Sequence, residues 1–174
     1  PAACDALLNY YRNSEMVQTM KAQFEAHRTL RAHRKAAINQ GIGQDSRAGA
    51  ILKDIITVLS VTAKVPRLPN GRLDWSYNGP AGDREWGWCL NRHYHLQVLL
   101  DAYLKTNNLS FVRCIDEHIR DWVISNPYPA KKSDTAQWRG LEVYHRIIFW
   151  AEIFYQLQQI DEFTPAARIL MLSS

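Results

Sequence analysis

Three neighbouring stretches decide the fold: LDWSYNGPAGDREWGWCLNR (73–92), FVRCIDEHIRDWVISNPYP (111–129) and QWRGLEVYHRIIFW (137–150). All six tryptophans of the chain lie between Trp75 and Trp150, with four of its six histidines. Arginines recur at helical spacing among these aromatic residues. Such a cluster is typical either of an ordinary aromatic core or of a groove that stacks on sugar rings and pairs with their carboxylates.

The composition is that of one globular domain. The chain has 174 residues, of which 47% are apolar, enough to build a core and too many for wholesale disorder. No apolar run approaches the roughly 20 residues that span a bilayer, and residues 1–16 lack the basic start and apolar run of a signal peptide. The chain stops at ARILMLSS (167–174), an apolar helical segment without a cap, so we expect a piece of a larger protein.

The net charge and the spacing of the cysteines limit the kinds of partner and metal site to be expected. The net charge of +4 is compatible with an anionic partner, either a polyanionic sugar or a nucleic acid, and equally with no partner. Cys4, Cys89 and Cys114 show no CxxC spacing, which argues against structural zinc. Cys89 and Cys114 could pair across a helical hairpin, but we expect buried free thiols. We expect no metal and no cofactor.

Helical periodicity runs through the first third of the chain. It predicts a helix over 2–13 and a second from Ser14–Glu15 to the glycines at 41 and 43. A third helix is expected to follow a cap at Asp45 or Ser46 and to carry apolar residues from Ile51 to Val61. The second helix has a basic face, which is more typical of a solvated surface than of a nucleic-acid site. The residues of this face are Lys21, Arg28, Arg31, Arg34 and Lys35.

The chain after residue 64 is also predicted to be mainly helical. Residues 65–83 form a long loop rich in proline and glycine, and Asp83 begins a helix that we expect to continue to Thr106. A helix over 111–124 forms a hairpin with it. A second long loop (126–137) precedes a helix over 138–158, and a last helix begins near Thr164 and Pro165. No segment alternates as a half-buried strand does, so we predict an all-α fold of seven helices.

The helix from Trp138 carries groups that suit an acidic sugar. Trp138, Glu142 and Arg146 follow one another at spacings of four residues, and Arg139 lies about 100° round the helix from Trp138. They offer a ring for stacking, a carboxylate for hydroxyl groups and guanidinium groups for carboxylate or sulfate. The alternative, somewhat favoured on these residues alone, is an ion pair between Glu142 and Arg146 with Trp138 in the core.

The helix from Asp83 presents a similar choice. Asn91 and Arg92 fall between large apolar positions, where an unpaired polar group is costly to bury, so they either bond to loops and helix ends or line a cleft. His93 and His95 point apart on a continuous helix and do not chelate one metal together. A lone histidine here is more often a hydrogen-bonding core residue than a general acid or base.

These residues resemble a known family. The loop Leu73–Asp74–Trp75 is followed by EWGWCLNRHYHL (85–96), AYLKTNN (102–108), HIRDWVISNPYP (118–129) and WRGLEVYHRIIFW (138–150). In order and spacing this series is similar to the N-terminal helical part of the heparinase II/III-like polysaccharide lyases. The resemblance covers about half of the chain, with 73–158 as its core, whereas residues 1–65 match only loosely. On this basis residues 1–174 form one helical domain, the N-terminal portion of a larger lyase.

The resemblance implies an (α/α) toroid of helical hairpins around a groove for uronic-acid polysaccharides. It also implies cleavage by β-elimination and a periplasmic or extracellular location. Members of the family use a tyrosine as acid and an asparagine or histidine to neutralise the uronate carboxylate. No matching Asn–His segment occurs here, so we expect the catalytic residues beyond Ser174 and a contribution of this chain to the groove only.

The expected partner is therefore an anionic, uronate-containing polysaccharide, rather than a membrane or a nucleic acid. The alternative is a non-catalytic helical module that binds carbohydrate or another protein. The residues expected to line or support the groove are Trp75, Tyr77, Asn91, Arg92, Trp138, Arg139, Glu142 and Arg146.

Overall fold

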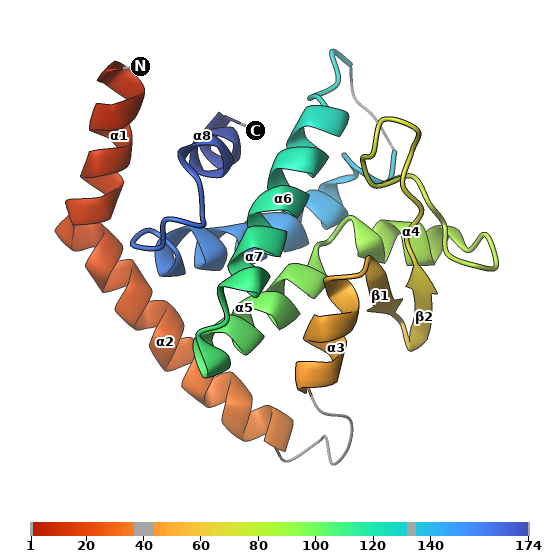
Figure 1. The fold of residues 1–174 in the computed structure, drawn as a ribbon, viewed down its shortest axis with the longest axis horizontal. Coiled ribbons are helices and arrows are strands. Elements are labelled where there is room, and N and C mark those ends of the chain that lie inside the picture. Colours follow the sequence, from red (N-terminus) through yellow and green to blue (C-terminus); the bar gives the residue numbers. More distant parts are fainter. Residues whose placement is uncertain (1, 37–43, 132–134, 174) are drawn as a thin grey trace.

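The computed structural model describes residues 2–36, 44–131 and 135–173, and the side chains of 2–28, 46–131 and 135–173. Within these residues the chain is mainly helical, as predicted, with one small sheet in addition (Figure 1). The elements are α1 (Ala2–Asn13), α2 (Glu15–Ala36), α3 (Gln44–Ile51), β1 (Ile55–Val58), β2 (Val61–Lys64), α4 (Arg84–Leu90), α5 (Tyr94–Thr106), α6 (Leu109–Ser125), α7 (Gly140–Gln156) and α8 (Pro165–Ser173).

Helix α5 lies at the centre of the packing. It contacts α3, α6 and α7, while α2 packs along α7 and α8 lies between α1 and α6 (Figure 1). Its Leu96 and Leu99 are fully buried together with Ile115 and Ile119 of α6 and Ile153 of α7. The expected pairing of the helix after Asp83 with the next helix is confirmed for α5 and α6, which are joined by a short turn.

The third helix, which we expected to continue to Val61, ends at Ile51, so the prediction is wrong beyond that residue. Asp54 takes a left-handed conformation (φ 62°), after which the chain forms an antiparallel hairpin of β1 and β2. Ile56 and Val58 point into the core, and the positive φ angles of Leu59 and Ser60 match a two-residue hairpin turn. The run of β-branched residues favours a strand, because their stiff side chains fit a pleated surface better than a helix.

The predicted continuous helix from Asp83 to Thr106 is also wrong, because it breaks into α4 and α5. The break is at His93, which has φ 62° and precedes the first residue of α5. Asp83 does cap α4, since its side chain accepts a 2.9 Å hydrogen bond from the backbone N–H of Glu85. Because of this break, the described residues contain eight helices rather than the predicted seven.

The other helix ends agree with the prediction to within a few residues. Asn108 caps α6 by accepting a hydrogen bond from the N–H of Ser110, and α8 begins at Pro165. Asp45 and Ser46 lie inside α3 and not at its cap, so that prediction is wrong. The two glycines expected to end the preceding helix, at 41 and 43, lie outside the described residues.

The basic face of α2 and the three cysteine thiols were both subjects of sequence-based expectations. Arg28 of the basic face is paired with Asp101 and Glu152, each within 2.9 Å, so this cation joins α2 to α5 and α7. The side chains of Arg31, Arg34 and Lys35 lie outside the described part. All three cysteines are free, and Cys89 and Cys114 are buried, as expected. No helix in the described residues is both long and apolar enough to cross a bilayer.

Candidate functional site

Asn91, directly after α4, lies at the centre of the candidate site and is completely buried. Its side-chain amide donates hydrogen bonds of 2.9 Å to the carbonyl oxygens of Trp75 and Gly87. Its side-chain oxygen accepts a hydrogen bond of 2.9 Å from Nε1 of Trp122. One amide therefore joins the loop at Trp75 to α4 and α6, which satisfies a polar group that would otherwise be costly to bury.

Arg146 lies beside Asn91 and is 3% exposed. Its guanidinium group donates to the carbonyl oxygens of Asn91 (2.8 Å) and Gln137 (2.9 Å). It also lies 3.9 Å from the ring centroid of Trp122, with two further indole rings at 5.5 and 5.9 Å. Burial lowers the pKa of Arg146 to about 10. This cation is thus held by carbonyl groups and aromatic faces and supports the site from within.

A cluster of opposite charges surrounds Glu142, which is completely buried. Oε1 of Glu142 accepts hydrogen bonds from Nε and Nη2 of Arg92 at 3.3 and 3.0 Å, and Oε2 lies 3.3 Å from Nε of Arg139. Arg92 also contacts Glu85 at 3.3 Å. The alternative of an ion pair between Glu142 and Arg146 is wrong, because among the described residues the carboxylate pairs with Arg92 and Arg139 instead.

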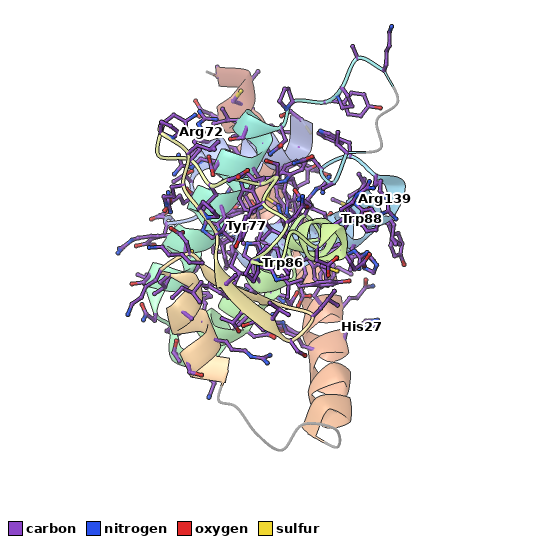
Figure 2. The ribbon with its side chains drawn as sticks, turned by 90° about the vertical axis from the view of Figure 1, so that its right-hand side faces the viewer. His27, Arg72, Tyr77, Trp86, Trp88 and Arg139 are labelled. Carbon is purple, nitrogen blue, oxygen red and sulfur yellow. The ribbon has the colours of Figure 1, made fainter. Side chains whose placement is uncertain are left out.

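Trp88, which we did not predict as a site residue, completes the exposed edge of this cluster. The guanidinium carbon of Arg139 lies 3.9 Å from the Trp88 ring centroid and that of Arg84 lies 5.3 Å away. Figure 2 shows Trp88 and Arg139 side by side, with Tyr77 and Trp86 nearby. The sequence signal was present in the i, i+4 spacing of Arg84 and Trp88. The contact with Arg139 required the tertiary structure.

Trp75 belongs to the core, with 2% of its surface exposed. Its Nε1 donates to Asp121 at 3.1 Å, and its ring stacks on His95 at 6.1 Å and lies 5.2 Å from His93. The expectation that His93 and His95 point apart is wrong, because their ring centroids lie 5.5 Å from each other. That expectation assumed a continuous helix, whereas the left-handed conformation of His93 brings the two imidazole rings to the same side. His93 accepts a 3.0 Å hydrogen bond from Nε1 of Trp150.

His95 acts as a core hydrogen-bonding residue, as expected. Its Nε2 lies 3.2 Å from Nδ1 of His118, whose Nε2 lies 3.6 Å from the Cys114 sulfur and 3.9 Å from Asp54. Burial opposes the charged form of His118, but its interactions with Asp54 and Cys114 raise the pKa of His118 to about 9. Burial lowers the pKa of His95 well below its ordinary value. The surroundings therefore shift the pKa values of these two neighbouring imidazoles in opposite directions.

The predicted site residues fall into two groups. Trp75, Asn91, Glu142 and Arg146 are at most 3% exposed and form a supporting layer. Four others are only partly buried and can reach a ligand: Tyr77, Arg92, Trp138 and Arg139. Tyr77 meets Trp86 edge to face at 5.4 Å, and Trp138 lies 5.4 Å from Trp122. Apart from Tyr77, contacts with one another or with shared neighbours bring these residues close together in space, while their contact with a ligand stays a prediction.

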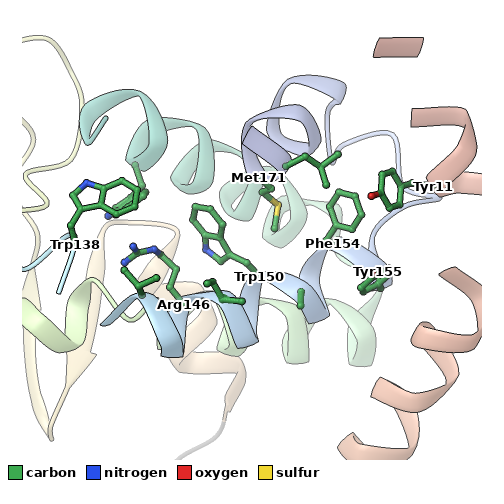
Figure 3. Close-up of a pocket in the computed structure, with 12 residues that line it drawn as sticks. Tyr11, Trp138, Arg146, Trp150, Phe154, Tyr155 and Met171 are labelled. Atoms are coloured by element: carbon green, nitrogen blue, oxygen red, sulfur yellow. The ribbon is translucent and has the colours of Figure 1, made fainter. Parts of the chain in front are cut away.

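An aromatic cleft of about 250 Å³ lies along α7, between this helix, α1 and α8 (Figure 3). Trp138 and Arg146 stand at one end, and the rings of Tyr11, Phe154 and Tyr155 continue towards the other. Arg146 is the one charged residue among those described that line it, and its guanidinium group is already held by carbonyl groups. The cleft therefore suits an apolar surface better than an anion.

His93, which lies beside the site, is completely buried. Burial lowers the pKa of His93 well below its ordinary value, so this imidazole is sealed in the core in its neutral form. Among the described residues no three His, Cys, Asp or Glu side chains group as a metal ion requires.

Comparison with known proteins gives two findings. The model of the family described as "Heparinase II/III N-terminus" matches residues 1–174. The chain is also 22% identical, over 163 residues, to a heparin-sulfate lyase of Bacteroides thetaiotaomicron. This alignment covers 94% of the chain and 23% of the relative, so the chain spans about a quarter of that protein. No solved structure matches.

Proposed function

Because the chain belongs to the heparinase II/III N-terminal family, we propose that it forms part of the substrate groove of a polysaccharide lyase. The expected substrate is a uronic-acid polysaccharide, which the whole protein cleaves by β-elimination. The observation that carries this proposal is the clustering of the predicted groove residues. Residues from α4, the α4–α5 break and α7 meet at the charged group of Arg92, Arg139 and Glu142.

The two layers of the site have different roles in this proposal. Tyr77, Arg92, Trp138 and Arg139 offer ring faces and cations at the surface, which suit the apolar face and the carboxylate of a uronate. The buried layer around Asn91 orients them, because bonded and packed side chains lose less freedom when a ligand binds. Binding energy from such subsites helps to hold the reacting sugar where the chemistry takes place.

The proposed reaction requires a base and an acid in the groove of the whole protein. In β-elimination a base removes the proton next to the uronate carboxylate, the bond to the glycosidic oxygen breaks, and an acid protonates the leaving oxygen. A carbon–carbon double bond remains in the new end of the sugar chain. Burial lowers the pKa of both His93 and His95 well below the ordinary value, so we assign this chain to substrate binding and leave the catalytic residues unassigned.

The arrangement of the helices and the cellular location are also proposed from the family resemblance. We place the helices in an (α/α) toroid, which the packing of α5 against α6 and α7 supports through its pairs of neighbouring helices. We place the protein in the periplasm or outside the cell, where uronate polymers are met.

The test is activity and binding by the full-length protein on a panel of uronate polymers. A lyase releases unsaturated oligosaccharides that absorb in the ultraviolet, so absorbance reports cleavage directly. Substitution of Trp138 by alanine is expected to weaken substrate binding by about two- to tenfold, because stacking of a ring contributes about 0.5–1.5 kcal/mol. A full-length protein that neither binds nor cleaves any uronate polymer contradicts the proposal.

The burial of His93, His95 and His118 favours a second candidate, a non-catalytic module that binds carbohydrate. The same panel separates the two. Binding of a polymer by the full-length protein without any release of unsaturated product supports the module, whereas release of product supports the lyase.

A further inference from the structure

Trp88 and the two arginines beside it form an unusual surface group. The indole is only partly buried, the guanidinium group of Arg139 lies over it at 3.9 Å, and that of Arg84 lies at 5.3 Å. A planar guanidinium on an aromatic face is held by attraction between the cation and the ring. Because the ring holds them, the two cations can meet a ligand with little further loss of side-chain freedom.

The charges around this group leave positive charge unpaired. Glu142 divides its two oxygens between Arg92 and Arg139, and Glu85 pairs with Arg92. Arg84 is exposed, and within the described part of the chain no carboxylate forms an ion pair with it. Three guanidinium groups thus face two carboxylates, which leaves an excess of one positive charge next to Trp88.

Hydrogen-bond donors at the start of α7 also lack acceptors. Nη1 of Arg139 is buried and has no hydrogen-bond partner among the described residues, although 29% of the Arg139 side chain is exposed. Nε1 of the adjacent Trp138 is likewise buried without a partner in this part of the structure. A buried donor that lacks an acceptor is costly, so an incoming oxygen that satisfies it gains that free energy. Sulfate and carboxylate groups supply such oxygens, and planar guanidinium groups bind them through two parallel hydrogen bonds.

We propose that Arg84, Trp88 and Arg139 form an anion subsite that binds a sulfate or carboxylate group of the polysaccharide. This inference rests on the proposed function and adds to it the residues that recognise charge. In it Arg139 provides the oriented donors, Arg84 closes the site from the exposed side, and Trp88 fixes the position of both cations. The aromatic cleft along α7 is separate, because its lining contributes no free cation.

The test measures binding by the full-length protein of three polymers: heparin (sulfated, with uronate), heparosan (uronate without sulfate) and dextran sulfate (sulfated, without uronate). Arg84→Gln and Arg139→Gln are each compared with Arg113→Gln, an exposed arginine of α6 that pairs with Glu162. We expect each of the first two variants to weaken binding by about tenfold, as for loss of one hydrogen bond to a charged group. Arg113→Gln is expected to change it less than twofold. Because Arg139 also pairs with Glu142, Arg84→Gln serves as the variant that does not disturb a buried ion pair.

The outcomes separate this inference from the proposed function. Weaker binding of heparin and dextran sulfate alone identifies a sulfate subsite, and weaker binding of heparin and heparosan alone identifies a carboxylate subsite. Binding of dextran sulfate that depends on Arg84, without binding of either uronate polymer, keeps the anion subsite and contradicts the proposed function. Unchanged affinity of Arg84→Gln and Arg139→Gln for every polymer that the wild-type protein binds overturns the subsite. Failure of the wild type to bind any of the three polymers overturns it as well.

Discussion

Replacement of Asn91 by leucine tests the buried layer that supports the site. Asn91 is completely buried and bonds through its side chain to Trp75, Gly87 and Trp122. Leucine has the same branching and the same number of side-chain heavy atoms, so the substitution removes hydrogen bonds without leaving a cavity. The expected cost therefore follows from what each partner loses.

The three partners of Asn91 lose different amounts. The carbonyl oxygen of Trp75 keeps a 3.2 Å hydrogen bond from Gln137, and that of Gly87 keeps a 3.3 Å bond from the backbone N–H of residue 91. Nε1 of Trp122 has no other acceptor among the described residues. An orphaned buried donor costs about 1–3 kcal/mol, and each weakened carbonyl about 0.5–1.5 kcal/mol. We expect a total loss of about 3–4 kcal/mol, a large part of the roughly 5–15 kcal/mol that stabilises a typical domain.

The assay is unfolding in guanidinium chloride, followed by tryptophan fluorescence and by circular dichroism. The expected loss corresponds to a melting temperature about 10 °C lower for a domain of this size. Asn126→Leu is the matched control, because Asn126 donates from its side chain to the Trp122 carbonyl, which its own backbone N–H also reaches. We expect this variant to lose less than about 1 kcal/mol.

A double-mutant cycle with Trp122→Phe isolates the cause. Phenylalanine lacks the indole N–H, so in the double variant no donor is left without an acceptor. We expect the double variant to be more stable than the sum of the single effects predicts, by about 1–2 kcal/mol. Additive effects, or a cost of Asn91→Leu below about 1 kcal/mol, would refute the reasoning that Asn91 holds the site together through these bonds.

Three other predictions concern pH, thiol reactivity and the loop before α4. The pKa of His118 is raised to about 9 in the folded protein, above its ordinary value of 6.5, so its contribution to stability is full below about pH 6.5 and is lost as the pH rises through 9. Unfolding free energies measured between pH 6 and pH 10 should fall for the wild type and less steeply for His118→Gln. Iodoacetamide at pH 8 should label exposed Cys4 in the native protein and spare Cys89, because burial raises the pKa of the Cys89 thiol to about 11. Mass spectrometry of native and denatured samples measures the labelling, and rapid labelling of Cys89 in the native protein contradicts the prediction. Gly79→Ala should destabilise the protein by at least about 2 kcal/mol, because Gly79 has φ 74° and the added Cβ would lie 2.7 Å from a ring atom of the indole that covers it. Gly82→Ala, at φ 68° with open space around it, should cost only about 1 kcal/mol, and equal melting temperatures for the two variants would exclude a steric effect.

Much of the helical architecture could be predicted from periodicity and caps. The cap at Asp83 and the start of α8 at Pro165 are local signals, because the residues that form them are neighbours in the chain. The family could also be predicted, since its pattern of aromatic and charged residues runs along the sequence. The hairpin at 55–64 was missed although its β-branched residues carried the signal, because the buried positions of a short strand also fit a helical pattern.

The candidate site depended more on tertiary structure. The sequence placed Glu142 and Arg146 one turn apart, which made an ion pair between them the natural expectation. In the fold the Glu142 carboxylate meets Arg92, fifty positions away, and Arg146 turns to backbone carbonyls and to Trp122. Trp88 became part of the site only when α7 brought Arg139 over its ring.

The sequence by itself determined that this chain is mainly helical, that all its tryptophans and most of its histidines lie between Trp75 and Trp150, and which family it belongs to. Those properties follow from residue types and spacings, which act over one or two helical turns. Only the tertiary structure decided where the helix after Asp83 breaks and which charges are left without partners. The reason is physical: a buried polar group bonds to whichever acceptor the packing brings near, and for Asn91 those partners come from a loop, α4 and α6.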